Sequence, residues 1–461
     1  MTRPRVCVLG AGASGISTAR LLVRRGYEVQ VLERSDRVGG MCRSIAYVEP
    51  DTGERRFFDV GANYITKDYR EVRALAQELN LELVTDTAFQ NQVALDVGTG
   101  RVVPGKVRVN EGISRVSFLC ASVKYLWLLR RYRDVVQKPG FVGVADKPDL
   151  LRPFDQWLDA HGLNALARLF MIPITAFGYG QLDEVPTPAA MKYIDSGRFL
   201  SMLATGLNLK QSWPRRVRDG FGTLMERAAA ELDVETDVRV DRVVRREGRV
   251  EVHVRGEAEP RVYDRLVVAM PPDKAVDLLD ATDDERRLFA PGVIEYRDFR
   301  ITTAEVPGFP YQVVLELEAA PDGGGRYPGG ARNPGHPWIF GKQWDDSRLL
   351  LFYANVPHDT TEHAVREQAR LDCEVALRAG RQGRWAAPHE YQRWPEYFPH
   401  VSIDDMRDFA GTGEGWYDLV QALQGQQSTY WVHGVIAFEL VEAIMEYARE
   451  VVEGHFPQVG A

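Results

Sequence analysis

Cysteine, excess positive charge and long apolar runs are all scarce in this chain of 461 residues. Its four cysteines form no C-x-x-C pair, which disfavours a disulfide framework or a zinc site and predicts a reduced, cytoplasmic protein without a bound metal. The formal net charge of −8 argues against a nucleic-acid partner, because phosphates attract basic surfaces. No run approaches the ~18 apolar residues of a membrane-spanning helix, and no signal peptide is evident at the start.

The first forty residues contain the pattern of a dinucleotide-binding βαβ unit. An apolar run over residues 6–9 leads into the G-x-G-x-x-G sequence of residues 10–15, and an amphipathic stretch follows. A second apolar run, residues 29–32, ends in Glu33, whose carboxylate can accept hydrogen bonds from a ribose. An acid at this position favours a free 2′-hydroxyl, and therefore FAD or NAD over NADP.

The glycines of this motif have separate tasks in a phosphate-binding turn. Gly10 permits the tight turn, Gly12 lets a pyrophosphate approach the backbone, and Gly15 lets the helix pack against the strand. The helix begins at about Ala13 and Ser14, where free N–H groups and a partial positive charge attract a phosphate. We therefore predict that all five residues bind the cofactor.

The stretch after this unit resembles a known family. Residues 33–44 contain E-R-x-D-R-x-G-G-x-x-x-S, which is similar to the pattern of FAD-dependent amine-oxidase-like and protoporphyrinogen-oxidase-like flavoproteins. Residues 57–64, with the sequence F-F-D-V-G-A-N-Y, look like the third flavin-contacting segment of that family. The resemblance implies FAD as the cofactor. It also implies further cofactor contacts at Arg34, Gly39, Gly40, Met41, Gly61, Ala62, Asn63, Tyr64 and Val243.

Three later motifs resemble one branch of the family, the bacterial polyenoic fatty acid isomerases. They are P-F-D-x-W-L at residues 153–158, T-A-F-G-Y-G at 175–180 and K-Y-I-D at 192–195. The resemblance implies that the second motif lies close to a substrate cavity, and Met202 occupies a position where the family has an aromatic residue. The candidate substrate-cavity residues are Thr175, Phe177, Tyr179, Met202, Trp344, Tyr353 and Tyr397.

The C-terminal segment is predicted to close the flavin site. Residues 429–439 have the pattern of a strand, a glycine turn and the start of a helix, whose N-terminus the family points at the flavin. Most members carry Gly-Asp or Gly-Glu in this turn, whereas this chain has His433 and Gly434. The segment lacks the cysteine of the covalent family members, so we expect non-covalent FAD, contacted here by His433, Gly434, Phe438 and Glu439.

The predicted fold class is α/β, with a Rossmann-like FAD-binding domain assembled from discontinuous segments and an inserted α+β substrate domain. The first domain comprises residues 1–104, 215–272 and 411–461, and the second 105–214 and 273–410. Residues 321–337, rich in glycine and proline, are expected to form a loop that could cover the cavity. His400, in an aromatic stretch expected to be a loop, is a weak candidate for a proton carrier.

Residues 112–137 form a long helical pattern that ends in a basic run, Arg130-Arg131-Tyr132-Arg133. The favoured interpretation is a substrate-domain helix with a solvated basic face. The other is contact with a membrane surface, because basic amphipathic helices bind such interfaces. No feature of the sequence indicates an oligomeric state.

The sequence shows no pair of a nucleophile and a base and no acid–base pair of carboxylates, so the cofactor is expected to carry the chemistry. The first hypothesis is a double-bond isomerase that passes a hydride from an allylic carbon of an unsaturated apolar chain to flavin N5 and back. The substrate could be a fatty acid, a polyene or an acyl chain on a carrier. The second is an FAD oxidase or desaturase acting on an apolar metabolite or an amine, and the third is a non-catalytic flavoprotein. An amine oxidase would need two parallel aromatic rings beside the flavin, for which Trp344, Tyr353, Tyr397 and Tyr430 are candidates.

Overall fold

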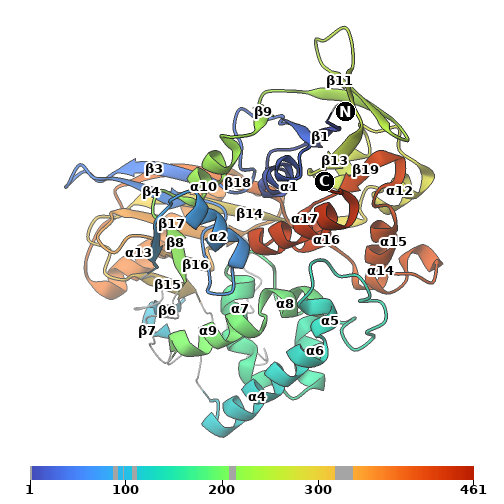
Figure 1. Cartoon of the computed structure of the whole chain (residues 1–461). Coiled ribbons are helices and arrows are strands. Elements are labelled where there is room, and N and C mark those ends of the chain that lie inside the picture. The colour runs from blue at the N-terminus through green and yellow to red at the C-terminus, as the bar shows by residue number, and fades with distance from the viewer. Residues whose placement is uncertain are drawn as a thin grey trace.

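A parallel five-stranded sheet lies at the centre of the first half of the fold (Figure 1). The computed structural model describes residues 3–86, 92–96, 98–105, 112–206, 214–316 and 336–460. The strands of this sheet are short, and all except the edge strand at residues 233–235 are mostly buried, as is typical of parallel sheets covered by helices. In spatial order they are β19 (Thr429–Trp431), β13 (Arg265–Val268), β1 (Arg5–Leu9), β2 (Glu28–Leu32) and β9 (Asp233–Glu235).

Helix α1 (Ala13–Arg24) connects β1 to β2, so the predicted βαβ unit is present. The C-terminal helix α17 (Val441–His455) packs on α1, and α10 (Phe221–Ala229) and α2 (Arg70–Glu78) lie beside it. Small sheets surround this core. One has three strands, β10 (Val240–Arg246), β11 (Arg249–Val254) and β12 (Arg261–Tyr263). The others are two-stranded: β3 (Ser44–Val48) pairs with β4 (Arg55–Asp59), and β5 (Leu83–Thr85) pairs with β8 (Arg215–Val217).

A mixed seven-stranded sheet forms the second half of the fold. In spatial order its strands are β18 (Ala387–Val401), β14 (Ile294–Glu305), β17 (Leu349–Asn355), β16 (Ile339–Lys342), β15 (Val313–Glu316), β6 (Gln92–Asp96) and β7 (Arg101–Pro104). Helix α13 (Glu362–Gly380) packs on this sheet. The hairpin of β6 and β7 extends it, although residues 92–104 precede the predicted start of the second domain.

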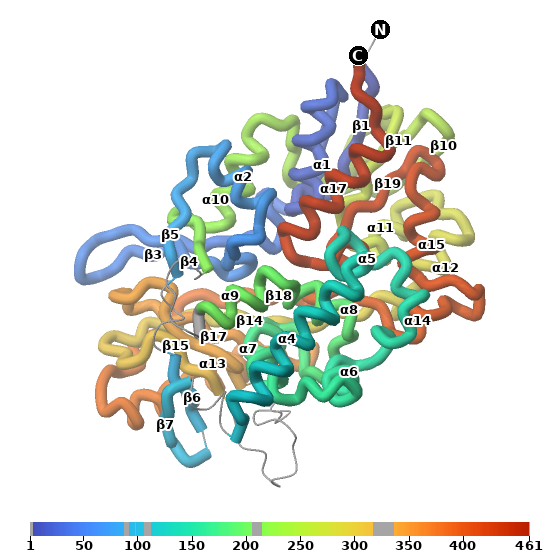
Figure 2. Tube along the Cα trace, turned by 60° about the horizontal axis from the view of Figure 1, so that its bottom comes forward, coloured from blue at the N-terminus to red at the C-terminus, as the bar shows by residue number. Residues whose placement is uncertain are grey.

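A group of helices occupies the end of the molecule farthest from the parallel sheet, at the bottom of Figure 1 and toward the viewer in Figure 2. Its members are α4 (Arg115–Arg131), α5 (Arg133–Val136), α6 (Phe154–Ala160), α7 (Ala167–Thr175), α8 (Thr187–Tyr193) and α9 (Ser196–Gly206). The remaining helices are short: α11 (Pro272–Ala275), α12 (Asp283–Leu288), α14 (Ile403–Arg407), α15 (Trp416–Ala422) and α16 (Gly434–Ala437). None of the described helices is long and apolar enough to cross a membrane.

One sequence expectation is wrong. The aromatic stretch of residues 391–400 is not a loop, because it lies inside β18, whose 15 residues pair antiparallel with β14. Three register shifts interrupt this pairing, and β18 contains three prolines, which lack the N–H that a regular ladder requires. Residues 321–335 of the expected covering loop lie outside the described residues.

Candidate flavin and substrate site

The glycine turn after β1 leaves room for a phosphate where the sequence predicts it. Gly10 has a φ of +102°, and a Cβ on Gly15 would lie 1.8 Å from the Gly10 carbonyl oxygen. A Cβ on Gly12 would meet only the Gly40 Cα, at 3.9 Å. Gly10 and Gly15 are therefore required by packing within the protein, whereas the open side of Gly12 is available to a ligand.

The two other predicted glycine segments converge on this turn. The Gly39 N–H donates to the Ala11 carbonyl at 2.8 Å, and residues 12 and 39 form an isolated β-bridge. A Cβ on Gly61 would lie 1.8 Å from the Met41 carbonyl oxygen. This oxygen accepts a hydrogen bond from the Ala62 N–H at 3.3 Å. Residues far apart in sequence thus form one backbone cradle, in which Gly15 and Gly61 leave no room for a side chain and Gly12 has an open side. Such a surface fits the extended diphosphate and ribityl chain of FAD.

The start of α1 and the end of β2 provide the polar groups of this cradle. No side chain caps α1 at Gly12, and its first turn carries no acid, so its N-terminal N–H groups suit a phosphate. Glu33 directly follows β2 and accepts from the Ala11 N–H at 2.7 Å and from the Ser35 N–H at 2.8 Å. Its carboxylate therefore sits beside the turn, where the predicted ribose contact requires it.

The remaining predicted cofactor residues have different surroundings. Arg34 is exposed and Asn63 is buried, both next to predicted contacts. Both backbone polar groups of Val243 are already bonded, its N–H to the Leu278 carbonyl at 2.7 Å and its carbonyl to the Asp280 N–H at 3.1 Å. A cofactor contact at Val243 would therefore fall to its side chain or to the second lone pair of its carbonyl.

The C-terminal segment contains a strand, β19, followed by a very short helix at the glycine turn. Helix α16 has only four residues, and Phe438, with a φ of +82°, separates it from α17. His433 caps α16, because its Nδ1 accepts the Val435 N–H at 3.3 Å. Burial lowers the pKa of His433 to about 4, so its imidazole is neutral near neutral pH. The sequence did not predict this capping role.

Aromatic rings connect the flavin segment to the substrate segment. The rings of Tyr64 and Phe177 lie edge to face with centroids 5.4 Å apart, and Tyr353 lies 6.2 Å from Phe177. The Tyr397 hydroxyl donates to the Phe177 carbonyl at 2.8 Å, and Tyr179 lies 5.8 Å from Tyr397. The structure therefore brings together four of the seven predicted cavity residues and one predicted cofactor residue.

Phe299, which the sequence did not indicate, is central to this group. It stacks on Tyr397 at 4.7 Å and on Tyr353 at 6.1 Å, with interplanar angles of 26° and 20°. Its position in β14, between β17 and β18, brings these rings together. Pairing between strands distant in sequence determines this neighbourhood, and it leaves no local sequence signal.

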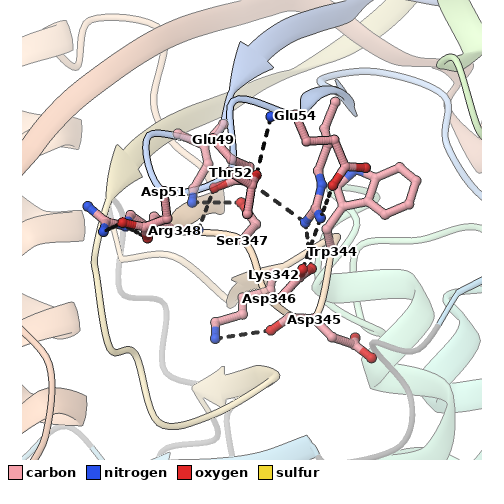
Figure 3. A network of polar contacts seen from close by, with 12 residues as sticks. Glu49, Asp51, Thr52, Glu54, Lys342, Trp344, Asp345, Asp346, Ser347 and Arg348 are labelled. Carbon is pink, nitrogen blue, oxygen red and sulfur yellow. Dashed lines mark hydrogen bonds and ion pairs between the residues drawn. The ribbon is translucent and has the colours of Figure 1, made fainter.

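Three other candidates lie apart from these stacked rings. Trp344 borders a polar network that joins residues 49–54 to residues 342–348 (Figure 3); its indole N–H donates to Phe57, and the Arg216 guanidinium lies 4.4 Å from its ring. Tyr430 lies in β19, with its ring 4.4 Å from Phe456. Met202 is half-buried in α9. The four candidate cage residues are therefore not assembled into one cage.

The buried hydroxyl of Thr175 has no hydrogen-bond partner within the described part of the chain. Such a group usually marks a bound water or ligand, because an unpaired buried hydroxyl is unfavourable. Thr175 ends α7, two residues before Phe177. Its oxygen is therefore available to a polar group of a ligand beside the aromatic rings.

Glu439 is a buried acid at the junction of the two halves of the site. It accepts the Phe398 N–H at 2.7 Å. Burial raises the pKa of Glu439 to about 7, although the hydroxyls of Tyr179 and Tyr397 favour its charged form. Phe398 and Phe438, on either side of this carboxyl, both have positive φ, which is uncommon for bulky residues. His400, by contrast, is buried, and desolvation lowers its pKa to about 4, so it is neutral near neutral pH.

The raised pKa of Glu439 predicts a pH-dependent difference between the natural protein and the variant Glu439→Gln. Below pH 4.5 the carboxyl is protonated in both the folded and unfolded chains and adds no pH-dependent term. Between pH 4.5 and about 7 only the unfolded chain ionises, so the natural protein loses stability as pH rises. We therefore compare the free energy of unfolding of the variant with that of the natural protein. Above about pH 7 this difference should favour the variant by on the order of 3 kcal/mol more than it does at low pH.

Thermal unfolding followed by circular dichroism across this pH range measures the effect. Glutamine retains an oxygen that can accept the Phe398 N–H, so the change isolates the charge. Parallel pH profiles of the two proteins would contradict the prediction.

The glycine cradle lies at a parallel sheet covered by helices, and a second sheet presents aromatic rings beside it. This arrangement is that of an FAD-dependent enzyme. A family model described as "Flavin containing amine oxidoreductase" matches residues 13–300, more than half of the chain. The chain therefore belongs to the flavin-containing amine oxidoreductase family, and FAD is its cofactor. The resemblance inferred from the sequence is confirmed.

Relatives of known sequence cover parts of the chain. A putrescine oxidase of Kocuria rosea is 28% identical over 297 residues, which are 58% of this chain and 57% of that protein. An uncharacterised protein of Acanthamoeba polyphaga mimivirus is 31% identical over 190 residues, 38% of this chain and 36% of that protein. The chain thus spans only about a third to somewhat over half of the length of these relatives.

Solved structures cover nearly the whole chain. A CLA-producing fatty acid isomerase from P. acnes has a TM-score of 0.81 and 25% identity, with 98% of this chain and 99% of that chain covered. A putrescine oxidase bound to putrescine has a TM-score of 0.66 at 14% identity, with 98% and 99% covered. The second similarity shows the fold alone.

Proposed function

We propose that this protein is an FAD-dependent isomerase that moves a double bond along an unsaturated, apolar, fatty-acid-like chain. Support comes from the fatty acid isomerase, whose similarity extends over 98% of this chain at a TM-score of 0.81, against 0.66 for the putrescine oxidase. The motifs of residues 153–158, 175–180 and 192–195 support the same assignment. The domain division and the individual contacts predicted from the sequence belong to this proposal.

The stacking of Phe299 is the observation that carries it. An amine oxidase would need an open slot between two parallel rings beside the flavin. Here the Phe299 ring stacks on both Tyr353 and Tyr397, and therefore occupies the space between them. Trp344 and Tyr430, the other two candidates, have separate surroundings. The aromatic groups therefore present an apolar surface, which favours a hydrocarbon over a charged amine.

The residues of the chain would orient the substrate and exclude water. Phe177 and Tyr353 provide apolar surface, and the bond from Tyr397 to the Phe177 carbonyl fixes the loop after α7. The free Thr175 hydroxyl can bind one polar group of the substrate. A hydrocarbon rearrangement needs no side-chain base, so the positioning of the reacting carbons is the main task of the protein.

Bound FAD supplies a two-electron acceptor that can return what it receives. The hydride lost by an allylic carbon is regained by another carbon of the same chain, so no oxidant is consumed and the product has the mass of the substrate. His433 is neutral near neutral pH, and the raised pKa of Glu439 reduces the negative charge that its carboxyl adds to this apolar site.

The second candidate function is an oxidase or desaturase of an apolar metabolite or an amine. The match to the putrescine oxidase over more than half of the chain favours it. Such an enzyme would remove two hydrogens from its substrate and pass the electrons to oxygen or another acceptor.

An anaerobic experiment separates the two functions. The purified FAD-loaded protein is mixed, without oxygen, with polyunsaturated free acids, their thioesters and a panel of amines. We expect an unsaturated chain to give a conjugated product of unchanged mass over many turnovers, with the flavin absorbance of the oxidised form recovered at the end. Persistent bleaching by one equivalent of substrate, with hydrogen peroxide released on admission of oxygen, would establish the oxidase instead.

A further inference from the structure

Helix α4 carries an unusual row of exposed apolar side chains. Val116 is 69% exposed, Leu119 64%, Val123 61% and Trp127 55%. Their spacings of three and four residues place them on one face of the helix. Exposed single apolar residues are ordinary, but a continuous row of four marks an interaction surface.

The opposite face of α4 already holds the helix in the fold. Tyr125 and Leu128 are buried there, and the Tyr125 hydroxyl donates to the Ile194 carbonyl at 2.8 Å. The Tyr125 ring also contacts Phe199 of α9, at 4.9 Å, and the next residue, Leu200, is 51% exposed. The exposed row is therefore not needed to anchor the helix.

Charge identifies the kind of partner. Helix α4 contains four basic residues and no acidic one, although the whole chain has a net charge of −8. Arg115 lies at its start and Arg130 and Arg131 at its end, and among the described residues none of the three forms an ion pair. The Arg131 guanidinium lies 5.6 Å from the Trp127 ring centroid. Apolar side chains flanked by cations, with an indole at the boundary, suit the interface of an anionic membrane.

We propose that this face of α4, the α4 surface (Val116, Leu119, Val123 and Trp127 with the flanking arginines), docks on an anionic lipid bilayer. The helix would lie in the plane of the interface, which agrees with the finding that none of the described helices can cross a membrane. A second copy of the chain is the weaker occupant, because two α4 surfaces would bring basic residues together with no acid on either helix.

The position of α4 agrees with this orientation. The helix lies along the edge of the molecule opposite the parallel sheet, so the α4 surface can meet a flat bilayer (Figure 1). Figure 2 shows α4 running across the face turned toward the viewer, with α7 and α9 behind it. The inference goes beyond the proposed function, because it concerns attachment and not turnover.

Co-sedimentation with vesicles tests the proposal. The full FAD-loaded protein is mixed with vesicles of phosphatidylcholine alone and with vesicles that also contain phosphatidylglycerol. We expect binding to the anionic vesicles, weakened by added salt. Leu119→Glu should bind these vesicles about tenfold more weakly, because a charge replaces apolar surface that the bilayer would bury. Arg130→Gln with Arg131→Gln should lose about thirtyfold and most of the preference for phosphatidylglycerol.

Leu371→Glu provides the matched control. Leu371 is also an exposed leucine, 42% accessible, but it lies on α13, which packs on the seven-stranded sheet and is not part of the α4 surface, so this variant should bind like the natural protein. Bound FAD and the circular dichroism of all variants should be unchanged. Equal vesicle binding by Leu119→Glu and the natural protein would overturn the proposal. So would a lack of vesicle binding by the natural protein together with a dimer, seen by light scattering, that Leu119→Glu abolishes.

Discussion

Gly15→Ala is expected to abolish FAD binding. The added Cβ would lie 1.8 Å from the Gly10 carbonyl oxygen, which is backbone at the centre of the phosphate-binding turn. The Val8 side chain, at 3.3 Å, limits the movement of the helix away from β1. The turn must therefore open, and overpacking of this kind costs about 1–3 kcal/mol in addition to the lost cofactor. Flavin absorbance per mole of purified protein and the melting temperature measure the two effects.

Two glycine variants serve as controls. Gly12→Ala should keep the fold, since its Cβ has only the Gly40 Cα near it, at 3.9 Å, but it should lose FAD because the methyl group occupies the open side of the cradle. Gly454→Ala, in α17 with no atom within 4 Å, should bind FAD normally and melt slightly higher. A Gly15→Ala protein that purifies with stoichiometric FAD would show that this turn does not hold the cofactor.

Arg245→Met is expected to cause the largest loss of stability. The side chain is fully buried and forms ion pairs with Glu285 at 2.6 Å and Asp280 at 2.8 Å. A further hydrogen bond, 3.3 Å long, reaches the Thr429 hydroxyl. Arg245 therefore joins β10, α12 and β19. The substitution leaves the buried carboxylate of Glu285 without its positive partner. Removing one partner of a buried ion pair costs about 3–5 kcal/mol of stability. Urea unfolding followed by circular dichroism measures this loss.

A second substitution tests this explanation. Glu285→Leu combined with Arg245→Met removes the uncompensated charge, and should recover part of the lost stability, whereas a simple loss of packing would not be recovered. Arg255→Met breaks the exposed pair with Asp241 and should leave the urea midpoint unchanged. Equal midpoints for Arg245→Met and Arg255→Met would contradict the argument.

The segments from which the cofactor site is predicted are each local in sequence. The turn of residues 10–15, Glu33 and the segments of Gly39 and Gly61 each depend on a short stretch of sequence, and the structure brings them together. A glycine motif between two apolar runs has few alternative structures, because backbone conformation and close approach both restrict it. The family, the cofactor and the α/β fold followed from these stretches.

The substrate half could be predicted only in part. Phe299 contacts Tyr353 and Tyr397 through pairing of three strands that are far apart in sequence, and no local pattern indicates this. The aromatic stretch of residues 391–400 was expected to be a loop, whereas it lies within β18. The capping role of His433 is also a tertiary effect, since burial makes its ring neutral and therefore able to accept a hydrogen bond.

The order of strands in the parallel sheet has a consequence for the synthesis of the protein. Strand β1 pairs with β13, which in turn pairs with β19, and α17 covers α1. The phosphate-binding turn is thus made early, whereas β19 and α17, which support it, follow more than 400 residues later in the chain. A nascent chain would expose the apolar faces of β13 and α1 throughout translation, and folding dominated by such distant contacts is slow. We therefore expect FAD to be acquired only after β19 and α17 have been made.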